Sequence, residues 1–280
     1  MGRLSIRKKN TAVSASRSDL RKQLHKAAQG NRDAFRSVAD QYLDLITEYL
    51  VVTGYHGKER IRFYAREIFH NLWLRIAYIR RVSDFERQLF IFLKQIPVNV
   101  APFQDLLTQK LVLLNSLQRF LVVGRDLENW TSKNLSLATR IPKYELGKPL
   151  FDAWKILVGF KTRDLDFATN ACMEKVVENM EGCQNRLEQQ RLCKKVKENA
   201  IASAFKADYL SLRCELVELR QNARWELAFK EVFLNEMVED ISVINPLKPD
   251  LAALLKNQVS FQYIPLEVTE AERSFAADIG

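Results

Sequence analysis

The residues of this chain best suited to a chemical role are basic and aromatic side chains in two stretches. Lys and Arg bind phosphate groups, and aromatic rings stack on unpaired bases. The candidates in the first stretch are Arg75, Tyr78, Arg80, Arg81 and Arg87. The candidates in the second are Lys133, Lys143, Tyr144, Lys148 and Lys155. These residues predict two surfaces that contact nucleic acid. The alternative is that Tyr78 and Phe85 belong to the core and that the cations form an ordinary solvated face.

No recognisable catalytic or metal-binding set accompanies them. The chain has no Gly-rich phosphate loop and no Ser-His or Cys-His pair with supporting context. Its four cysteines form no C-x-x-C pair, and its three histidines lie far from them, so the spacing is not that of a zinc site. We therefore expect reduced cysteines, no metal, no cofactor and no enzymatic activity. A scattered active site and a redox pair of Cys172 and Cys183 remain alternatives.

Charge is divided unevenly along the 280 residues. Residues 1–160 carry a formal net charge of +13 and residues 161–280 one of −4, which together give +9. A basic half joined to a mildly acidic half fits a polyanionic partner for the first half. The basic start of the chain lacks the apolar core of a signal peptide, and Leu89–Leu93 is too short to span a membrane. We expect a cytoplasmic protein with no membrane contact.

Scarce Gly and Pro, with abundant Leu, Ala, Glu, Lys and Arg, predict an all-α protein. Apolar residues recur at helical spacing in most of the chain, for example at Phe35, Val38, Tyr42, Leu45 and Ile46. The predicted parts are a disordered basic arm at 1–17, a helical domain at 18–97, a helix-turn-helix domain at 103–160 and a helical extension at 161–280. The expected helices before the extension cover 18–31, 32–54, 58–80, 83–96 and 103–124. Within the extension, residues 200–241 lack Gly and Pro and predict one very long helix.

Residues 128–157 have the pattern of a short amphipathic helix, a tight turn and a second amphipathic helix. This pattern is typical of a DNA-reading helix-turn-helix. However, Gly147 costs about 1 kcal/mol inside a helix, and Pro149 costs about 3 kcal/mol there. Both costs disappear if the second helix starts late, because Pro is tolerated in a first turn.

Residues 27–95 resemble region two of the bacterial extracytoplasmic-function (ECF) sigma factors. The sequence GNRDAF matches the family's G-D-x-x-A-F phrase, and REIFHNLW matches its Q-E-x-F-x-x-x-W phrase with Arg66 in place of Gln. FERQLFIF matches a later F-x-x-W-L-x-x-I phrase with Gln88 in place of Trp. The matching positions are Phe35, Tyr42, Glu67, Phe69, Trp73, Phe85 and Leu89.

Residues 111–157 resemble region four of the same family, in the expected order along the chain. The family's E-G-x-S-x-x-x-I-A-x-x-L-G-I-S phrase corresponds to ENWTSKNLSLATRIP. The matching positions are Glu128, Thr131, Leu135, Ala138 and Ile141, with Leu150 and Ala153 continuing the register. Together the two regions cover a little under half of the chain.

The chain departs from the family at two functional phrases. Residues 60–63, Arg-Ile-Arg-Phe, replace an acidic phrase that helps sigma factors bind the largest polymerase subunit. Residues 145–149, Glu-Leu-Gly-Lys-Pro, replace the phrase that reads the major groove, and the carboxylate of Glu145 is repelled by phosphate. The first departure weakens the expectation of polymerase binding, and the second weakens that of promoter reading.

The resemblance implies a transcription initiation factor that binds promoter DNA and core RNA polymerase, with polymerase contacts at Arg66, Glu67 and Phe69. The acidic extension would then be an autoinhibitory cover or a docking arm, for example for an anti-sigma regulator. The alternative is a sigma-derived interaction or structural module that binds nucleic acid without sequence preference, or not at all.

Overall fold

The computed structural model describes residues 17–99, 105–160, 165–179 and 186–243. All regular elements in these ranges are helical, which confirms the all-α prediction. The predicted basic arm, apart from Arg17, lies outside the described residues, as do Cys183 and the chain after Val243. Within the described ranges, no helix combines the length and the apolar character needed to cross a membrane.

The first part of the fold contains four α-helices and the 3-10 turn η1. These are α1 (Arg17–Ala28), α2 (Arg32–Val52), α3 (Lys58–Leu74), η1 (Ile76–Tyr78) and α4 (Val82–Leu93). Gly30, at φ 89°, ends the first helix, and the Asn31 side chain accepts a hydrogen bond from the Ala34 N–H to begin the second. The predicted apolar stripe of α2 is buried, as is that of α3. The helix predicted over 58–80 ends earlier, at Leu74.

The second part is more divided than predicted. It contains α5 (Leu106–Leu113), α6 (Ser116–Val122), the π-helical turn η2 (Val123–Leu127), α7 (Ser132–Thr139), η3 (Lys143–Glu145) and α8 (Gly147–Val158). The single helix predicted over 103–124 is interrupted because Asn115 forms a capping box with Gln118 and starts a new helix. The last helix begins late, so Pro149 lies in its first turn, as the alternative for this stretch required.

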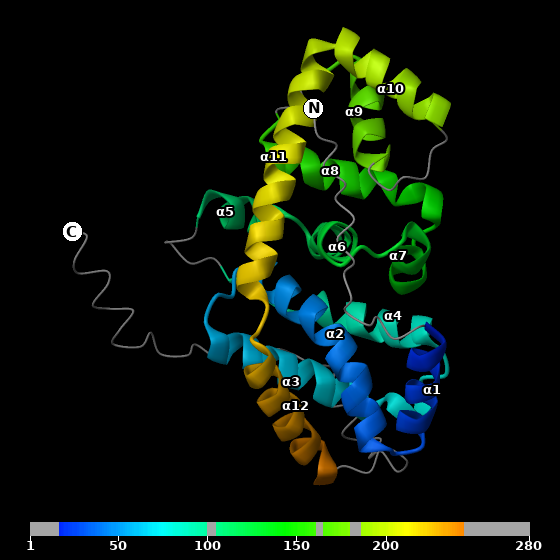
Figure 1. Ribbon diagram of the computed structural model, residues 1–280, viewed down its shortest axis with the longest axis vertical. Helices are drawn as coiled ribbons and strands as arrows, with labels where there is room; N and C mark the ends of the chain where they lie inside the picture. Colours follow the sequence, from blue (N-terminus) through cyan, green and yellow to red (C-terminus); the bar gives the residue numbers. More distant parts are fainter. Residues whose placement is uncertain (1–16, 100–104, 161–164, 180–185, 244–280) are drawn as a thin grey trace, which may run out of the picture.

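Within its described residues, the C-terminal extension contains α9 (Phe167–Asn179), α10 (Arg186–Glu198), α11 (Ala200–Ala223) and α12 (Leu227–Asp240), followed by η4 (Ile241–Val243). The prediction of one helix over 200–241 is wrong, because the chain leaves helical geometry at Arg224 and Glu226. Figure 1 shows α11 slanting one way along the molecule and α12 turning away from it below.

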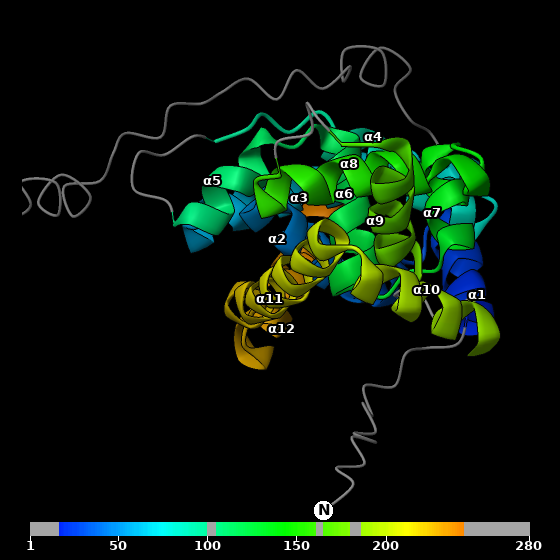
Figure 2. The same cartoon turned by 90° about the horizontal axis from the view of Figure 1, so that it is seen from above.

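The extension packs along both preceding parts. α11 contacts α8 and α9 at one end and α2 and η2 at the other, while α12 contacts α2 and α3 (Figures 1 and 2). The two earlier parts also contact each other directly, chiefly through α4 and α7. The helices that carry the candidate cations are therefore held in fixed relation to one another.

Candidate nucleic-acid interface

The first candidate stretch surrounds the start of α4. Tyr78 is 63% exposed, so it is not a core residue, whereas Phe85 is fully buried against Tyr42 with 5.0 Å between ring centroids. Arg80 and Arg81 precede the helix and are exposed. Neither of these arginines forms an ion pair with the described residues, so both are available to an external anion.

The other two arginines of this stretch already have partners. The Arg75 guanidinium donates to the Gln88 side chain at 3.3 Å and lies 5.1 Å from the centroid of the Phe92 ring. Arg87 pairs with Asp84 at 3.7 Å, one helical turn away. Both contacts hold these side chains against the protein, which makes them weaker candidates for phosphate binding than Arg80 and Arg81.

The second candidate stretch runs from α7 to the start of α8. Lys133, Lys143 and Lys148 are exposed and form no ion pair with the described residues, and Tyr144 is 84% exposed. Lys155 differs, because it pairs with Asp152 at 2.6 Å and lies over the Phe151 ring. Thus η3 and the first turn of α8 carry cations and an aromatic ring toward solvent.

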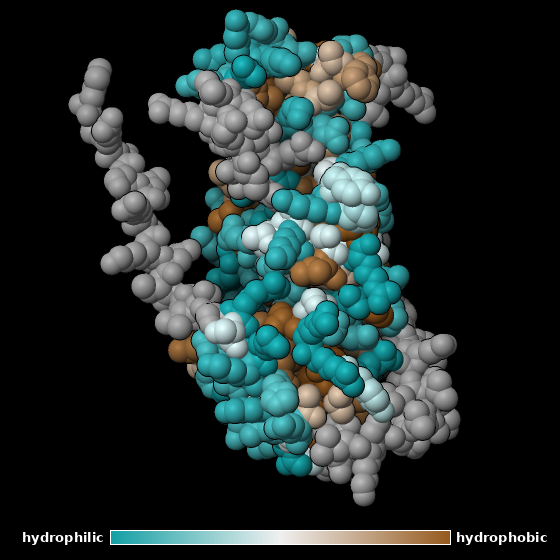
Figure 3. Space-filling model, turned by 90° about the vertical axis from the view of Figure 1, so that its right-hand side faces the viewer, coloured by the Kyte–Doolittle hydropathy of each residue, from teal (hydrophilic) through white to brown (hydrophobic). Residues whose placement is uncertain are grey.

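The packing of α4 against α7 brings the two stretches onto neighbouring elements. We call Arg80, Arg81, Lys133, Lys143 and Lys148 the cationic set. Figure 3 views the molecule from the side on which α1, α4 and α7 lie in Figure 1, and this face is largely hydrophilic. Exposed cations with aromatic neighbours suit contacts to phosphates and to unstacked bases.

The geometry around α8 does not resemble that of a free reading helix. This helix packs against α6, α9 and α11, and Leu150, Ala153 and Trp154 are buried there. α7 packs mainly on α4 instead. A recognition helix lies in the major groove with its N-terminal residues at the base edges. On α8, Lys148 and Ile156 are exposed, and Asp152 is partly exposed but paired with Lys155.

The residues that the resemblance assigned to polymerase contacts lie on α3, beneath α12. Phe69 is fully buried, with its ring centroid 6.4 Å from that of Phe35 and 6.4 Å from that of Phe233. Arg66 pairs with Glu236 at 3.3 Å and with Asp240 at 3.1 Å. Glu67 is half-buried. α12 therefore covers this part of α3.

Further ion pairs fix α12 to α2 and α3. Arg62 pairs with Glu236, Arg36 pairs with Glu231, and the Arg36 Nε donates to the Asn235 side chain at 3.0 Å. The acidic side chains of α12 thus neutralise Arg36, Arg62 and Arg66, whereas the cationic set stays exposed.

A buried ionic network joins α11 to both earlier parts, and sequence analysis missed it. Glu48 of α2 is 0% exposed, and its Oε1 accepts from the Nε atoms of Arg220 at 3.0 Å and Arg224 at 3.4 Å. Both arginines also donate to Glu128, at 2.9 and 3.1 Å. Burial, reinforced by the Glu128 charge and opposed by the two arginines, raises the pKa of Glu48 to about 8.

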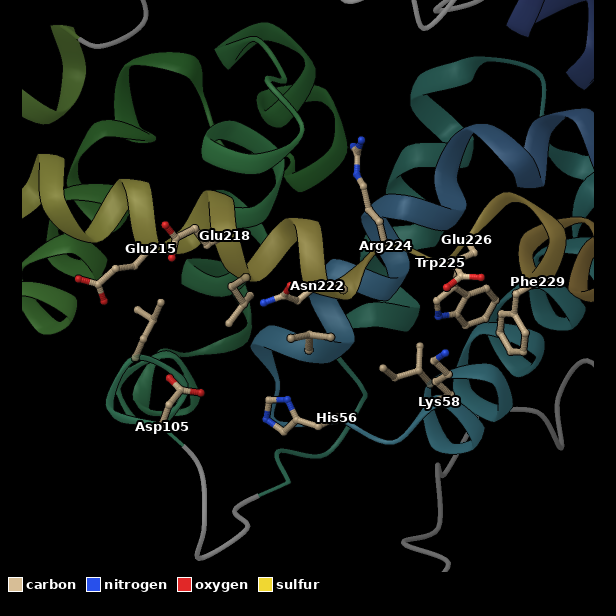
Figure 4. A pocket seen from close by; sticks show the side chains of 15 residues that line it. His56, Lys58, Asp105, Glu215, Glu218, Asn222, Arg224, Trp225, Glu226 and Phe229 are labelled. Atoms are coloured by element: carbon tan, nitrogen blue, oxygen red, sulfur yellow. The ribbon is translucent and has the colours of Figure 1, made fainter.

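An open pocket of about 560 Å³ lies beside this network, at the junction of α11 and α12 (Figure 4). Glu215, Glu218 and Asn222 line it from α11, and His56 and Asp105 face them from the loops before α3 and α5. Burial lowers the pKa of His56, and the Asp105 charge opposes this effect. Among the described residues, no group of three or more His, Cys, Asp or Glu side chains could hold a metal ion.

The chain matches no protein-family model, and neither the curated proteins nor the solved structures gave a significant match. The function is therefore inferred from the chain's own geometry and charge.

Proposed function

We propose that the protein is a sigma-like nucleic-acid-binding module that holds phosphate backbones through the cationic set and has little base preference. We also propose that this module works in the cytoplasm, where nucleic acid is accessible.

The observation that carries the proposal is that two groups of basic residues differ in whether acidic side chains pair with them. Arg36, Arg62 and Arg66 are paired with the acidic side chains of α12. The cationic set is exposed and has no ion-pair partner among the described residues, although the extension contains more acidic than basic residues. Phosphate contacts supply affinity without sequence information, whereas base reading needs side chains in a groove.

The burial of α8 favours this function over promoter reading. Its flanks are covered by α6, α9 and α11, and Glu145 and Pro149 replace base-reading residues of the sigma family at its start. Tyr78 and Tyr144 add exposed rings near the cations, and such rings stack on bases of any identity. We therefore expect single-stranded nucleic acid to bind at least as well as duplex.

Recruitment to core RNA polymerase through Arg66, Glu67 and Phe69 is a separate prediction. Phe69 is buried under Phe233, and Arg66 is paired with Glu236 and Asp240. Binding there requires α12 to leave α3. A pull-down of core polymerase with the full chain, compared with a Phe233→Asp variant that weakens α12 docking, tests this prediction. Retention only with the variant would support it, and retention with neither protein would contradict it.

The test of nucleic-acid binding compares two charge-matched double variants of the full chain. Arg80→Ala with Arg81→Ala removes two members of the cationic set. Lys195→Ala with Lys197→Ala removes the same charge from α10, which lies away from α4 (Figure 1). With a fluorescent strand of about 20 nucleotides at about 50 mM salt, the first variant should bind at least about tenfold more weakly than wild type, and the second within about threefold. Equal losses in both variants would reject the proposed surface.

A further inference from the structure

The residues between α11 and α12 include none of the types that normally end a helix. Arg224, Trp225 and Glu226 include no Gly or Pro, and residues 200–241 contain neither. Positions 216, 223, 230 and 237 keep a seven-residue spacing across it; Leu216, Ala223 and Met237 are buried, and Lys230 pairs with Asp40 and Asp44 of α2. One continuous amphipathic helix would place these apolar residues on a single face.

Tertiary contacts hold the break instead. The Arg224 guanidinium contacts Glu48, Glu128 and Asp44, which lie on other elements. The Trp225 ring packs edge-on against Phe229 and Phe233 of the following helix, at 4.8 and 5.0 Å between centroids, and Phe233 in turn packs against Phe69 of α3. Local sequence and tertiary contacts therefore favour different geometries at this junction.

α12 lies against α2 and α3 in a contact with complementary charge and a buried apolar centre. Phe233, Leu234 and Met237 are almost completely buried there. Around them, Glu231, Glu236 and Asp240 meet Arg36, Arg62 and Arg66. We call the surface of α2 and α3 that receives α12 the docking face.

We propose that α12 can leave its own docking face by fusion of α11 and α12 into one helix, and that it then occupies the docking face of a second copy of this chain. Because α12 turns away from α11 in Figure 1, straightening the junction carries α12 away from its own α2 and α3. The second copy is the occupant that this surface fits, since its α12 has the same apolar residues and the same three acidic partners. The exchange is reciprocal and closes a twofold dimer.

Charge reversal separates exchange between two chains from docking within one. Arg62→Glu with Arg66→Glu reverses the docking face, and Glu236→Arg with Asp240→Arg reverses the helix. In each variant alone, positions 62 and 66 of the docking face meet positions 236 and 240 of α12 with like charge, within the chain or between chains. In an equimolar mixture, each α12 finds a complementary docking face only on the other variant.

The expected result is a species of twice the chain mass in the mixture, measured by size-exclusion chromatography with light scattering at about 100 µM. The separate variants should remain monomeric, with the helical content of wild type by circular dichroism. A mixture that stays monomeric while both variants are folded would overturn the exchange.

A second pair of variants tests the straightened helix itself. Leu227 is the first residue of α12 and is 75% exposed, and Glu226 before it has φ −58° and ψ 147°. Proline is accepted at the first position of a helix and after an extended residue, but not inside a continuous helix. Leu227→Pro added to both charge variants should therefore abolish the dimer and leave the monomers folded. Persistence of the dimer would overturn helix fusion as its route.

Discussion

Replacement of Glu48 by Gln should change how the stability of this protein depends on pH. Glu48 is fully buried between Arg220, Arg224 and Glu128, and its pKa is raised from 4.5 to about 8. The unfolded chain loses this proton near pH 4.5, while the folded chain keeps it up to about pH 8. The stabilisation from the protonated group is therefore fully present below pH 4.5 and is lost as pH rises through the window between the two values.

The size of the effect follows from the two pKa values. Each pKa unit corresponds to about 1.4 kcal/mol, so the interval from 4.5 to about 8 corresponds to about 5 kcal/mol at most. Between about pH 5 and pH 8 the wild type should lose about 3 kcal/mol through this group. The amide that Glu48→Gln introduces is neutral at every pH, and its carbonyl can accept from Arg220 as the carboxylate does. The variant should thus match wild type near pH 5 and exceed its stability by about 3 kcal/mol at pH 8.

Urea unfolding of both proteins at pH 5, 6, 7 and 8 measures this difference. Other titrating groups are shared by the two proteins and cancel in the comparison. Glu231→Gln is the matched control, because it makes the same chemical change at a side chain that is half exposed instead of buried. A pH-independent difference for Glu48→Gln would refute the reasoning. It would mean that the two arginines keep Glu48 ionised in the folded protein.

Three further changes have defined outcomes in the same assay. Phe233→Ala should lower the free energy of unfolding by about 3 kcal/mol, because it leaves a cavity at the centre of the α12 contact, where Phe69 and Trp225 pack against Phe233. A decrease below about 0.5 kcal/mol would mean that α12 adds nothing to the hydrophobic core. Gly124→Ala should lower the free energy of unfolding by about 1–2 kcal/mol, because the new Cβ would lie 2.8 Å from a methyl carbon of the buried Leu135. A more stable variant would contradict this packing. Arg220→Ala should cost about 2–4 kcal/mol in wild type at pH 8 and less in the Glu48→Gln background, because the buried charge is then absent; equal costs in both backgrounds would show that the two residues are not coupled.

Local pattern was sufficient to predict most helices and their buried faces. Apolar residues recur at helical spacing in α2 and α3. Gly30 and Asn31 mark the boundary between α1 and α2, because Gly commonly ends a helix and Asn commonly caps the start of the next one. Pro149 also indicated where α8 could begin, because a proline fits only its first turn. Such features depend on residues a few positions apart, which a sequence displays directly.

Features that depend on distant residues were not predictable in this way. The helix breaks at Arg224–Glu226 because Arg224 contacts Asp44 and Glu48 of α2 and also Glu128, and nothing in the composition of the break indicates this. The pairing of Arg62 with Glu236 joins residues 174 positions apart. The burial of Glu48 was weakly indicated by the sequence. Residues Leu45–Val52 are apolar on nearly every side of α2, so a carboxylate among them has little access to water. Its arginine partners, however, come from another part of the chain.

The most direct test of the proposed function is the salt dependence of binding by the full chain to two duplexes of about 20 base pairs, equal in composition and shuffled in sequence. The proposal predicts Kd values within about threefold of each other at every salt concentration. It also predicts a slope of log K against log salt of about −3 to −5, as expected for three to five phosphate contacts. Absence of binding at about 50 mM salt would contradict the proposal. A preference of about 100-fold or more for one duplex would also contradict it, because that preference requires base reading.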